Sequence, residues 1–157
     1  KDLGMHRKVQ LVVSGGIRTG ADVAKALALG ADAVSIGVAA MIALGDNAPE
    51  HQEEYEKLGS GAGYYDDWHE GRDPAGISTQ DEELGKRFNA ELGGRRLANY
   101  LRAMVLETQT LARACGKSDV RNLEPEDLVA LTIEAAAMAR VPLAGTKWIP
   151  GLNGNTE

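Results

Sequence analysis

Glycines stand at two points in the first part of the chain where a phosphate group could bind. Gly15 and Gly16 directly follow one apolar run, and Gly37 follows a second. A phosphate approaches backbone N–H groups closely only where no Cβ intervenes, and glycine also adopts the positive φ angles that such turns use. Arg18 would add positive charge, and a short helix beginning near Val38 would add its N-terminal dipole. The two turns therefore predict a site for a phosphorylated ligand.

The alternative interpretation is that these glycines only make tight turns and close helix–strand contacts. It suits an isolated Gly-Gly pair, whereas two glycine turns that each end a hydrophobic strand favour a phosphate site. A dinucleotide site of the Rossmann type fits less well. Gly15-Gly16 followed by Gly20 is not the GxGxxG spacing, and no acidic residue closes the next strand.

The elements that must position these turns follow from hydrophobic spacing. The predicted elements are a strand over 10–14, a helix over 21–29, a second strand over 33–37 and a short helix over 38–44. Thr19 is the expected N-cap of the first helix, and Gly30 its C-terminal stop. Apolar strands bounded by glycines suit a parallel sheet that is buried on both faces. This α/β pattern is the layout of the phosphate site in the last two βα units of a (β/α)8 barrel.

The rest of the chain is predicted to form loops and helices. Residues 46–63 are acidic and polar, which suits an insertion or a surface helix with loops. Apolar positions over 95–114, ended by Gly116, predict an amphipathic helix of about five turns. Another helix is expected to begin at Pro125 and to end at Val141. Its predicted buried stripe is Leu128, Leu131, Thr132, Ala135, Met138 and Ala139.

Composition excludes several classes of protein. The 157 residues carry 17 Lys and Arg against 23 Asp and Glu, a formal charge of −6, so neither nucleic acid nor a membrane surface is an expected partner. The longest apolar run, over 33–44, is too short for a transmembrane helix. The single cysteine, Cys115, cannot form an internal disulfide, and nothing near it in the sequence marks a reactive thiol. These features predict a reduced, cytoplasmic protein.

Particular segments resemble known families. SGGIRTG at 14–20, ADVAKA at 21–26 and GADAVSIG at 30–37 are similar to the phosphate segment shared by FMN-binding barrels and the IMP dehydrogenase group. PAGISTQDEEL at 74–84 resembles the segment that follows the iron–sulfur cysteines in the large subunit of glutamate synthase. With IALG at 42–45, the resemblance to that family runs from about residue 10 to residue 127.

The resemblance to glutamate synthase breaks at the cluster cysteines. The three positions that carry the 3Fe–4S cysteines in the family are occupied here by Asp46, Trp68 and Asp73. Carboxylates and an indole cannot replace thiolates on such a cluster, so no iron–sulfur cluster is expected. In this respect the chain resembles shorter, cluster-free glutamate-synthase-like flavoproteins, which include the large subunit of N-methylglutamate synthase. The stretch LAGTKWIPG at 143–151 is similar to the C-terminal part of those proteins.

Acidic and aromatic residues gather around His69. Mixed oxygen ligands could hold a divalent cation there, but four carboxylates within eight residues and a single histidine favour a solvated acidic loop, and no metal is expected. Tyr64, Tyr65 and Trp68 could stack on a flavin. Packing of this loop against the barrel is the favoured interpretation.

The resemblance implies an FMN-dependent enzyme of the glutamate synthase type that handles glutamate and an amine. Its reaction would be amino transfer to 2-oxoglutarate or formation of N-methylglutamate. The residues implied to hold the FMN phosphate are Ser14, Gly15, Gly16, Arg18, Gly37 and Val38. No general acid or base is nominated, because residues that touch the flavin ring and the substrate are expected on earlier barrel strands.

Two strands cannot close a barrel, so we expect the C-terminal part of a longer polypeptide that supplies strands 7 and 8. The predicted divisions are the last two βα units over 1–45, an insertion with the glutamate-synthase-like loop over 46–94, and a helical extension with a tail over 95–157. Trp148 in that tail predicts an oligomer or a multi-subunit complex. Two alternatives stay open: an IMP dehydrogenase or GMP reductase-type barrel, and a non-catalytic assembly module whose glycines serve only packing.

Overall fold

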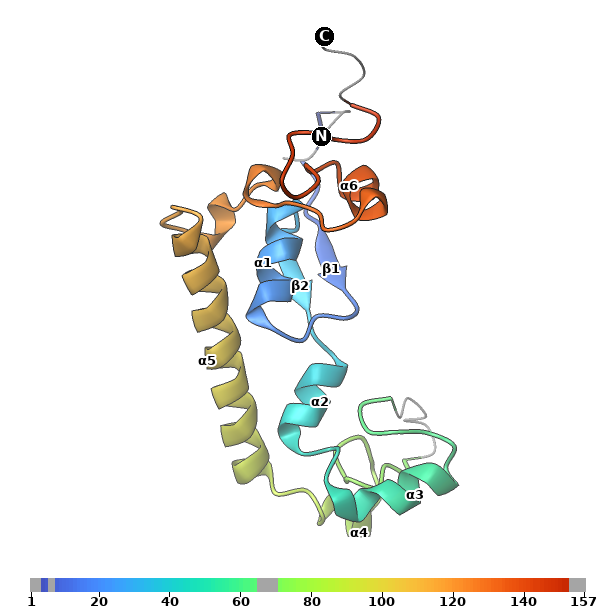
Figure 1. The fold of residues 1–157 in the computed structure, drawn as a ribbon. Coiled ribbons are helices and arrows are strands. Elements are labelled where there is room, and N and C mark those ends of the chain that lie inside the picture. Colours follow the sequence, from blue (N-terminus) through green and yellow to red (C-terminus); the bar gives the residue numbers. More distant parts are fainter. Residues whose placement is uncertain (1–3, 6–7, 65–70, 153–157) are drawn as a thin grey trace. The chain divides into compact units, whose positions relative to one another are not determined.

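A computed structural model describes residues 4–5, 8–64 and 71–152 of the chain (Figure 1). The elements in chain order are β1 (Val12–Ser14), α1 (Gly20–Ala28), β2 (Ala33–Ser35), α2 (Val38–Leu44), α3 (Gln52–Lys57), α4 (Glu82–Gly85), α5 (Ala90–Ala114) and α6 (Ile133–Ala139). Short 3-10 turns lie at Pro49–His51, Val120–Asn122 and Pro125–Asp127. None of the helices in the described part of the chain has the length and apolar character to cross a membrane.

The chain divides into two compact units. The first comprises residues 1–14, 19–35 and 104–157, and the second comprises residues 15–18 and 36–103. The first unit therefore holds the sheet, α1, the C-terminal part of α5 and α6, while the second holds α2, α3, α4 and the N-terminal part of α5.

The sheet of the first unit confirms the predicted strand–helix–strand pattern. β1 and β2 are parallel, with Val12 opposite Ala33 and Ser14 opposite Ser35. Because Ser14 and Ser35 are register partners, the chain leaves both strands at the same edge of the sheet. The prediction that both strand faces are buried is wrong for this chain, since Val12 is 61% exposed. Two strands and one crossover helix leave too little structure to cover both faces.

The helix between the strands, α1, has the ends that the sequence predicts. The Thr19 side chain accepts a hydrogen bond from the Asp22 N–H, and the Asp22 carboxylate accepts one from the Thr19 N–H at 3.0 Å. This capping box satisfies two of the N–H groups that a helix leaves without partners. At the other end Gly30 has a φ of +107°, the left-handed conformation typical of a glycine stop.

Close packing of α1 on α5 builds the core of the first unit. A Cβ added at Gly20 would lie 2.4 Å from the Met104 carbonyl oxygen, so only glycine fits there. The Gly20 N–H donates to the Glu107 carboxylate at 2.7 Å, and the Thr108 hydroxyl contacts the Gly20 carbonyl oxygen. Small residues continue this close approach, and the buried cluster consists of Ala24, Ala28, Ala112 and Leu123.

The prediction of a helix that starts at Pro125 is wrong. Pro125–Asp127 is a single 3-10 turn, the chain is then extended, and α6 begins only at Ile133. The Ala130 N–H donates to the Pro142 carbonyl and the Ala130 carbonyl accepts from the Ala144 N–H, both at 2.8 Å, so these groups are not available to a helix. Of the predicted buried stripe, Leu131 is 85% and Met138 87% exposed.

In the second unit, α2 has the predicted extent and ends at Gly45 in the left-handed conformation. The long helix α5 begins at Ala90 instead of at residue 95. The reason is Asn89, whose side-chain oxygen accepts from the Leu92 N–H at 2.9 Å and so caps the helix five residues earlier than predicted. Gly116 stops α5 as expected, with a φ of +75°.

Candidate functional site

The loop after β1 carries the first predicted pair of phosphate-binding glycines. Gly15 has a φ of +97° and Gly16 a φ of +71°, so both adopt conformations that other residues rarely take. A Cβ added at either glycine would meet no atom within 4 Å. Close helix–strand packing is therefore not the reason for glycine here. The positive φ angles and the open space are what a backbone-amide cradle for an anion requires.

The loop after β2 carries the other two predicted phosphate-binding residues, Gly37 and Val38. Gly37 is exposed, a Cβ there would also meet nothing within 4 Å, and no side chain caps the start of α2. Val38 is half-buried because the turn at Gly63 lies against it, where a Cβ would come within 2.7 Å of the Val38 side chain. The first residues of α2 are thus held in place while Gly37 faces open space.

Arg18 is exposed, and its backbone is anchored from α5. The Tyr100 hydroxyl donates a hydrogen bond to the Arg18 carbonyl oxygen, across 82 positions of sequence. Tyr100 has no signal in the sequence that pairs it with Arg18, so reasoning from the sequence missed it. Five of the predicted site residues lie in the second unit, namely Gly15, Gly16, Arg18, Gly37 and Val38, while Ser14 ends β1 in the first.

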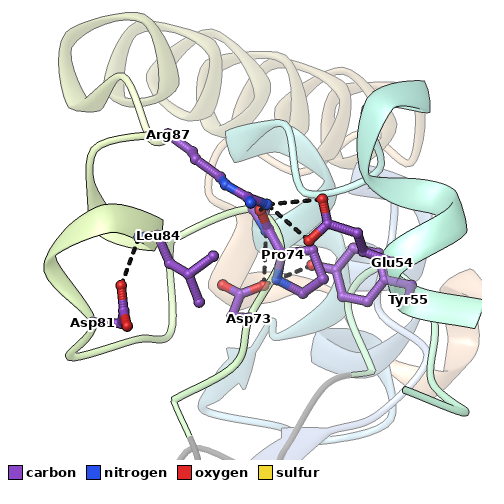
Figure 2. Close-up of polar contacts among 8 residues, drawn as sticks. Glu54, Tyr55, Asp73, Pro74, Asp81, Leu84 and Arg87 are labelled. Atoms are coloured by element: carbon purple, nitrogen blue, oxygen red, sulfur yellow. Dashed lines mark hydrogen bonds and ion pairs between the residues drawn. The ribbon is translucent and has the colours of Figure 1, made fainter. Parts of the chain in front are cut away.

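The second unit also contains a buried polar cluster, formed by Asp46, Tyr55 and Asp73. Asp46 and Asp73 are each 1% exposed, and Tyr55, on α3, is 3% exposed. The Tyr55 hydroxyl makes hydrogen bonds to Oδ1 of both aspartates, with Asp73 at 2.8 Å. Figure 2 shows Tyr55 and Asp73 from this cluster. Asp46 and Asp73, which stand at cluster-cysteine positions in the resemblance, are therefore joined by Tyr55. The sequence analysis did not identify Tyr55.

Backbone N–H groups also donate hydrogen bonds to both aspartate side chains. Asp73 accepts from Ala75 at 3.1 Å, from Ile77 at 2.7 Å and from Ser78 at 2.6 Å, which folds the start of the PAGISTQDEEL segment around one side chain. Asp46 accepts from the N–H of Gly63. Each aspartate thus closes a loop as well as contacting Tyr55.

The environment of Tyr55 keeps its hydroxyl protonated. Burial raises the pKa of Tyr55 far above its usual value, and the hydrogen bond that Tyr55 donates to Asp73 raises it further. Tyr55 is consequently a neutral phenol with a single hydrogen to donate.

Arg87 also binds the PAGISTQDEEL segment, through the carbonyl oxygen of Pro74. Its Nη1 lies 3.0 and 2.9 Å from the two Glu54 carboxylate oxygens and 3.1 Å from the Pro74 carbonyl oxygen (Figure 2). Asp81 caps α4 by accepting from the Leu84 N–H at 2.9 Å. These contacts join α3, the loop and α4.

The polar cluster offers neither thiolates nor a metal site of ordinary composition. Among the described residues, no group of three or more His, Cys, Asp or Glu side chains could hold a metal ion. His69, Tyr65 and Trp68 lie outside the described residues, as do Asp66, Asp67 and Glu70. Tyr64 is 64% exposed and Trp148 41% exposed. Cys115 is exposed.

Comparison with known proteins identifies related sequences. A family model described as the conserved region in glutamate synthase matches residues 1–50 and 60–118. The chain is 74% identical over 151 residues to a glutamate synthase large subunit-like protein of Rhizobium meliloti, covering 96% of this chain and 34% of that protein. It is 36% identical over 149 residues to an archaeal-type glutamate synthase (NADPH) of Dehalococcoides mccartyi, covering 92% of this chain and 27% of the relative.

A third relative is an archaeal-type glutamate synthase (NADPH) of Thermotoga maritima, which is 42% identical over 123 residues, covering 78% of this chain and 21% of the relative. The chain therefore spans about a third or less of the length of these relatives. No solved structure matches it.

Proposed function

The chain belongs to the glutamate synthase family, and from this we propose that it supplies the last two βα units and the FMN phosphate site of a (β/α)8-barrel flavoenzyme. Proteins of this family typically bind FMN. The barrel needs eight parallel strands, of which β1 and β2 would be the seventh and eighth. The remaining strands would come from other parts of a longer polypeptide, since this chain covers a third or less of its relatives.

The observation that carries the proposal is the conformation of the first glycine loop. Gly15 and Gly16 are consecutive residues with positive φ and open space where a Cβ would stand. Gly37 offers the same open space after β2, and the two strands end at the same edge of the sheet. An anionic phosphate fits amides presented in this way.

Each of the remaining site residues has a defined part in this proposal. The Ser14 hydroxyl would donate to a phosphate oxygen, the Val38 N–H would add a backbone donor, and Arg18 would supply positive charge. Tyr100 would position Arg18 through its carbonyl oxygen. When bound, FMN supplies the redox chemistry, while these residues hold and orient its phosphate.

The whole protein would act on glutamate and an amine, in the cytoplasm. Two reactions fit this proposal, amino transfer to 2-oxoglutarate and formation of N-methylglutamate. We propose no general acid or base in this segment that would distinguish them. The name of the Rhizobium meliloti relative, large subunit-like, supports a multi-subunit assembly. The carboxylates and phenol at Asp46, Asp73 and Tyr55 support an enzyme without an iron–sulfur cluster at this point of the chain.

The proposal is tested by placing side chains in the two loops of the full-length natural protein. Gly16→Val and Gly37→Val should each abolish or sharply reduce FMN retention through gel filtration, measured by flavin absorbance after denaturation. Gly59→Val is the control for Gly16, because Gly59 has a φ of +68° and open space where its Cβ would stand. Gly61→Val is the control for Gly37→Val, because Gly61 has open space where its Cβ would stand and no positive φ. Both controls should retain FMN.

Unchanged FMN retention in both loop variants would remove the phosphate assignment and favour the assembly-module interpretation. A nucleoside monophosphate in place of flavin would instead favour the IMP dehydrogenase or GMP reductase type. Family membership favours the flavin.

A further inference from the structure

In the cluster of Asp46, Tyr55 and Asp73, two carboxyl oxygens contact the phenol oxygen, but the phenol has a hydrogen for only one of them. The Tyr55 hydroxyl oxygen lies within hydrogen-bonding distance of Oδ1 of both aspartates. A phenol has one hydrogen, and an ionised carboxylate only accepts. If both carboxylates were ionised, one of them would face the phenol oxygen with no hydrogen between them. Two such oxygens, buried from water, repel each other.

The hydrogen bonds of the two carboxyl groups decide which of them holds a proton. Asp73 accepts from three backbone N–H groups and from Tyr55, so both of its oxygens are already surrounded by donors. Several N–H donors stabilise the ionised form of a carboxyl group. Asp46 accepts from one backbone N–H, that of Gly63, on its Oδ2, which leaves Oδ1 facing the phenol. A hydrogen on Asp46 Oδ1 gives every oxygen of the cluster a complementary partner and leaves the ionised form to Asp73, which has the larger number of N–H donors.

We propose that Asp46, Tyr55 and Asp73 form one proton-sharing clasp, in which Asp46 is a neutral carboxylic acid that donates to the Tyr55 oxygen and Tyr55 donates to ionised Asp73. The clasp carries one negative charge instead of two. Its burial is thereby less costly than that of two charged carboxylates would be.

The clasp is a positioning device for two loops of the second unit. Through Asp46 it holds the N–H of Gly63, whose backbone lies against the Val38 side chain at the start of α2. Through Asp73 it holds the N–H groups of Ala75, Ile77 and Ser78. These contacts lie within one unit and do not depend on the flavin, so the clasp stands or fails separately from the proposed function.

Infrared spectroscopy of the full-length natural protein, with 13C-labelled aspartate, tests the proton directly. At neutral pH the clasp predicts a protonated carboxyl C=O stretching band that shifts on labelling, is lost in Asp46→Asn and remains in an Asp81→Asn control. Asp81 is exposed and accepts only local backbone N–H bonds at the start of α4, so its substitution leaves the contacts of the clasp in place. Absence of a band that depends on Asp46 would overturn the proposal.

A pair of isosteric substitutions tests the assignment within the clasp. In Asp46→Asn the amide NH2 donates to Tyr55 where the carboxyl hydrogen did, so hydrogen exchange of residues 71–85 should stay within about threefold of the wild type. In Asp73→Asn the amide NH2 faces backbone donors, and exchange in the same residues should rise about tenfold or more. Equal effects of the two substitutions, or the reverse order, would contradict the assignment. If Asp73→Asn does not fold, the infrared result and Asp46→Asn still decide.

Discussion

At the scale of single residues, Gly20 sets how closely α1 can approach α5. Its missing Cβ would lie 2.4 Å from the Met104 carbonyl oxygen and 2.6 Å from the Glu107 Cβ, so a methyl group there must push the two helices apart. We predict that Gly20→Ala lowers the free energy of unfolding by about 1–3 kcal/mol, measured by chemical denaturation. Gly94→Ala is the matched control, since Gly94 lies in α5 with open space around its Cβ position.

Gly94→Ala should raise the free energy of unfolding by about 0.5–1 kcal/mol, because alanine favours a helix over glycine. A loss of stability in the control, or none in Gly20→Ala, would show that the close approach of α1 and α5 is not what requires glycine.

The pair of Asp119 and Arg121 makes a prediction about pH. The side-chain hydrogen bonds from Arg121, followed by its backbone N–H, lower the pKa of Asp119 to about 2. Because the folded pKa is depressed, the stabilisation by this pair is present above the unfolded value of about 3.9 and is lost as the pH falls towards 2. An NMR titration of 13C-labelled aspartate should show this low value, and Arg121→Ala should move it upwards. An unchanged titration in Arg121→Ala would contradict the assignment of the low pKa to Arg121.

Reasoning from the sequence found some members of the polar sites and missed others. Asp46 and Asp73 stand out because they occupy cluster-cysteine positions in a resemblance, but Tyr55 sits in an acidic surface helix with no signal of its own. The contact of Tyr100 with Arg18 is likewise invisible, since it joins residues 82 positions apart. Hydrogen bonds across loops depend on how the chain folds back, which local spacing does not encode.

At the scale of elements, α1 depends on its N-terminal capping box. Thr19→Ala removes the side-chain oxygen that accepts from the Asp22 N–H, at 3.3 Å. We predict a loss of about 1 kcal/mol in the free energy of unfolding, measured by urea denaturation. Thr110→Ala is the control, because Thr110 is exposed and bonds only to the Leu106 carbonyl within α5.

The control should cost nothing or add a few tenths of a kcal/mol, roughly the gain in helix propensity. Equal losses for Thr19→Ala and Thr110→Ala would mean that the cap contributes no more than any surface threonine.

Elements with their own start and stop signals were predictable from the sequence, and elements fixed by distant pairing were not. The strand–helix–strand unit and its Gly30 stop follow from local spacing and caps, and the structure confirms both. The helix expected from Pro125 failed because Ala130 pairs with the segment around Leu143. Its apolar spacing of three and four residues was genuine, yet the backbone groups found partners further along the chain.

At the scale of the whole molecule, the chain shows an incomplete sheet. Val12 and Leu11 are 61% and 50% exposed, although both belong to the apolar run that predicts a buried strand. In the proposed barrel, neighbouring strands from the rest of the protein would cover such positions. The sequence could indicate a barrel from two βα units and a resemblance, but not where the covering elements lie.

The central claim, that the two glycine loops belong to an FMN site, is tested most directly by identifying the group bound to the full-length natural protein. The protein should be purified without added cofactor and its absorption spectrum recorded, and the released small molecule should be identified by mass spectrometry. We predict flavin absorption bands and the release of FMN. Release of a nucleoside monophosphate, or failure to bind any flavin even after incubation with FMN, would contradict the claim.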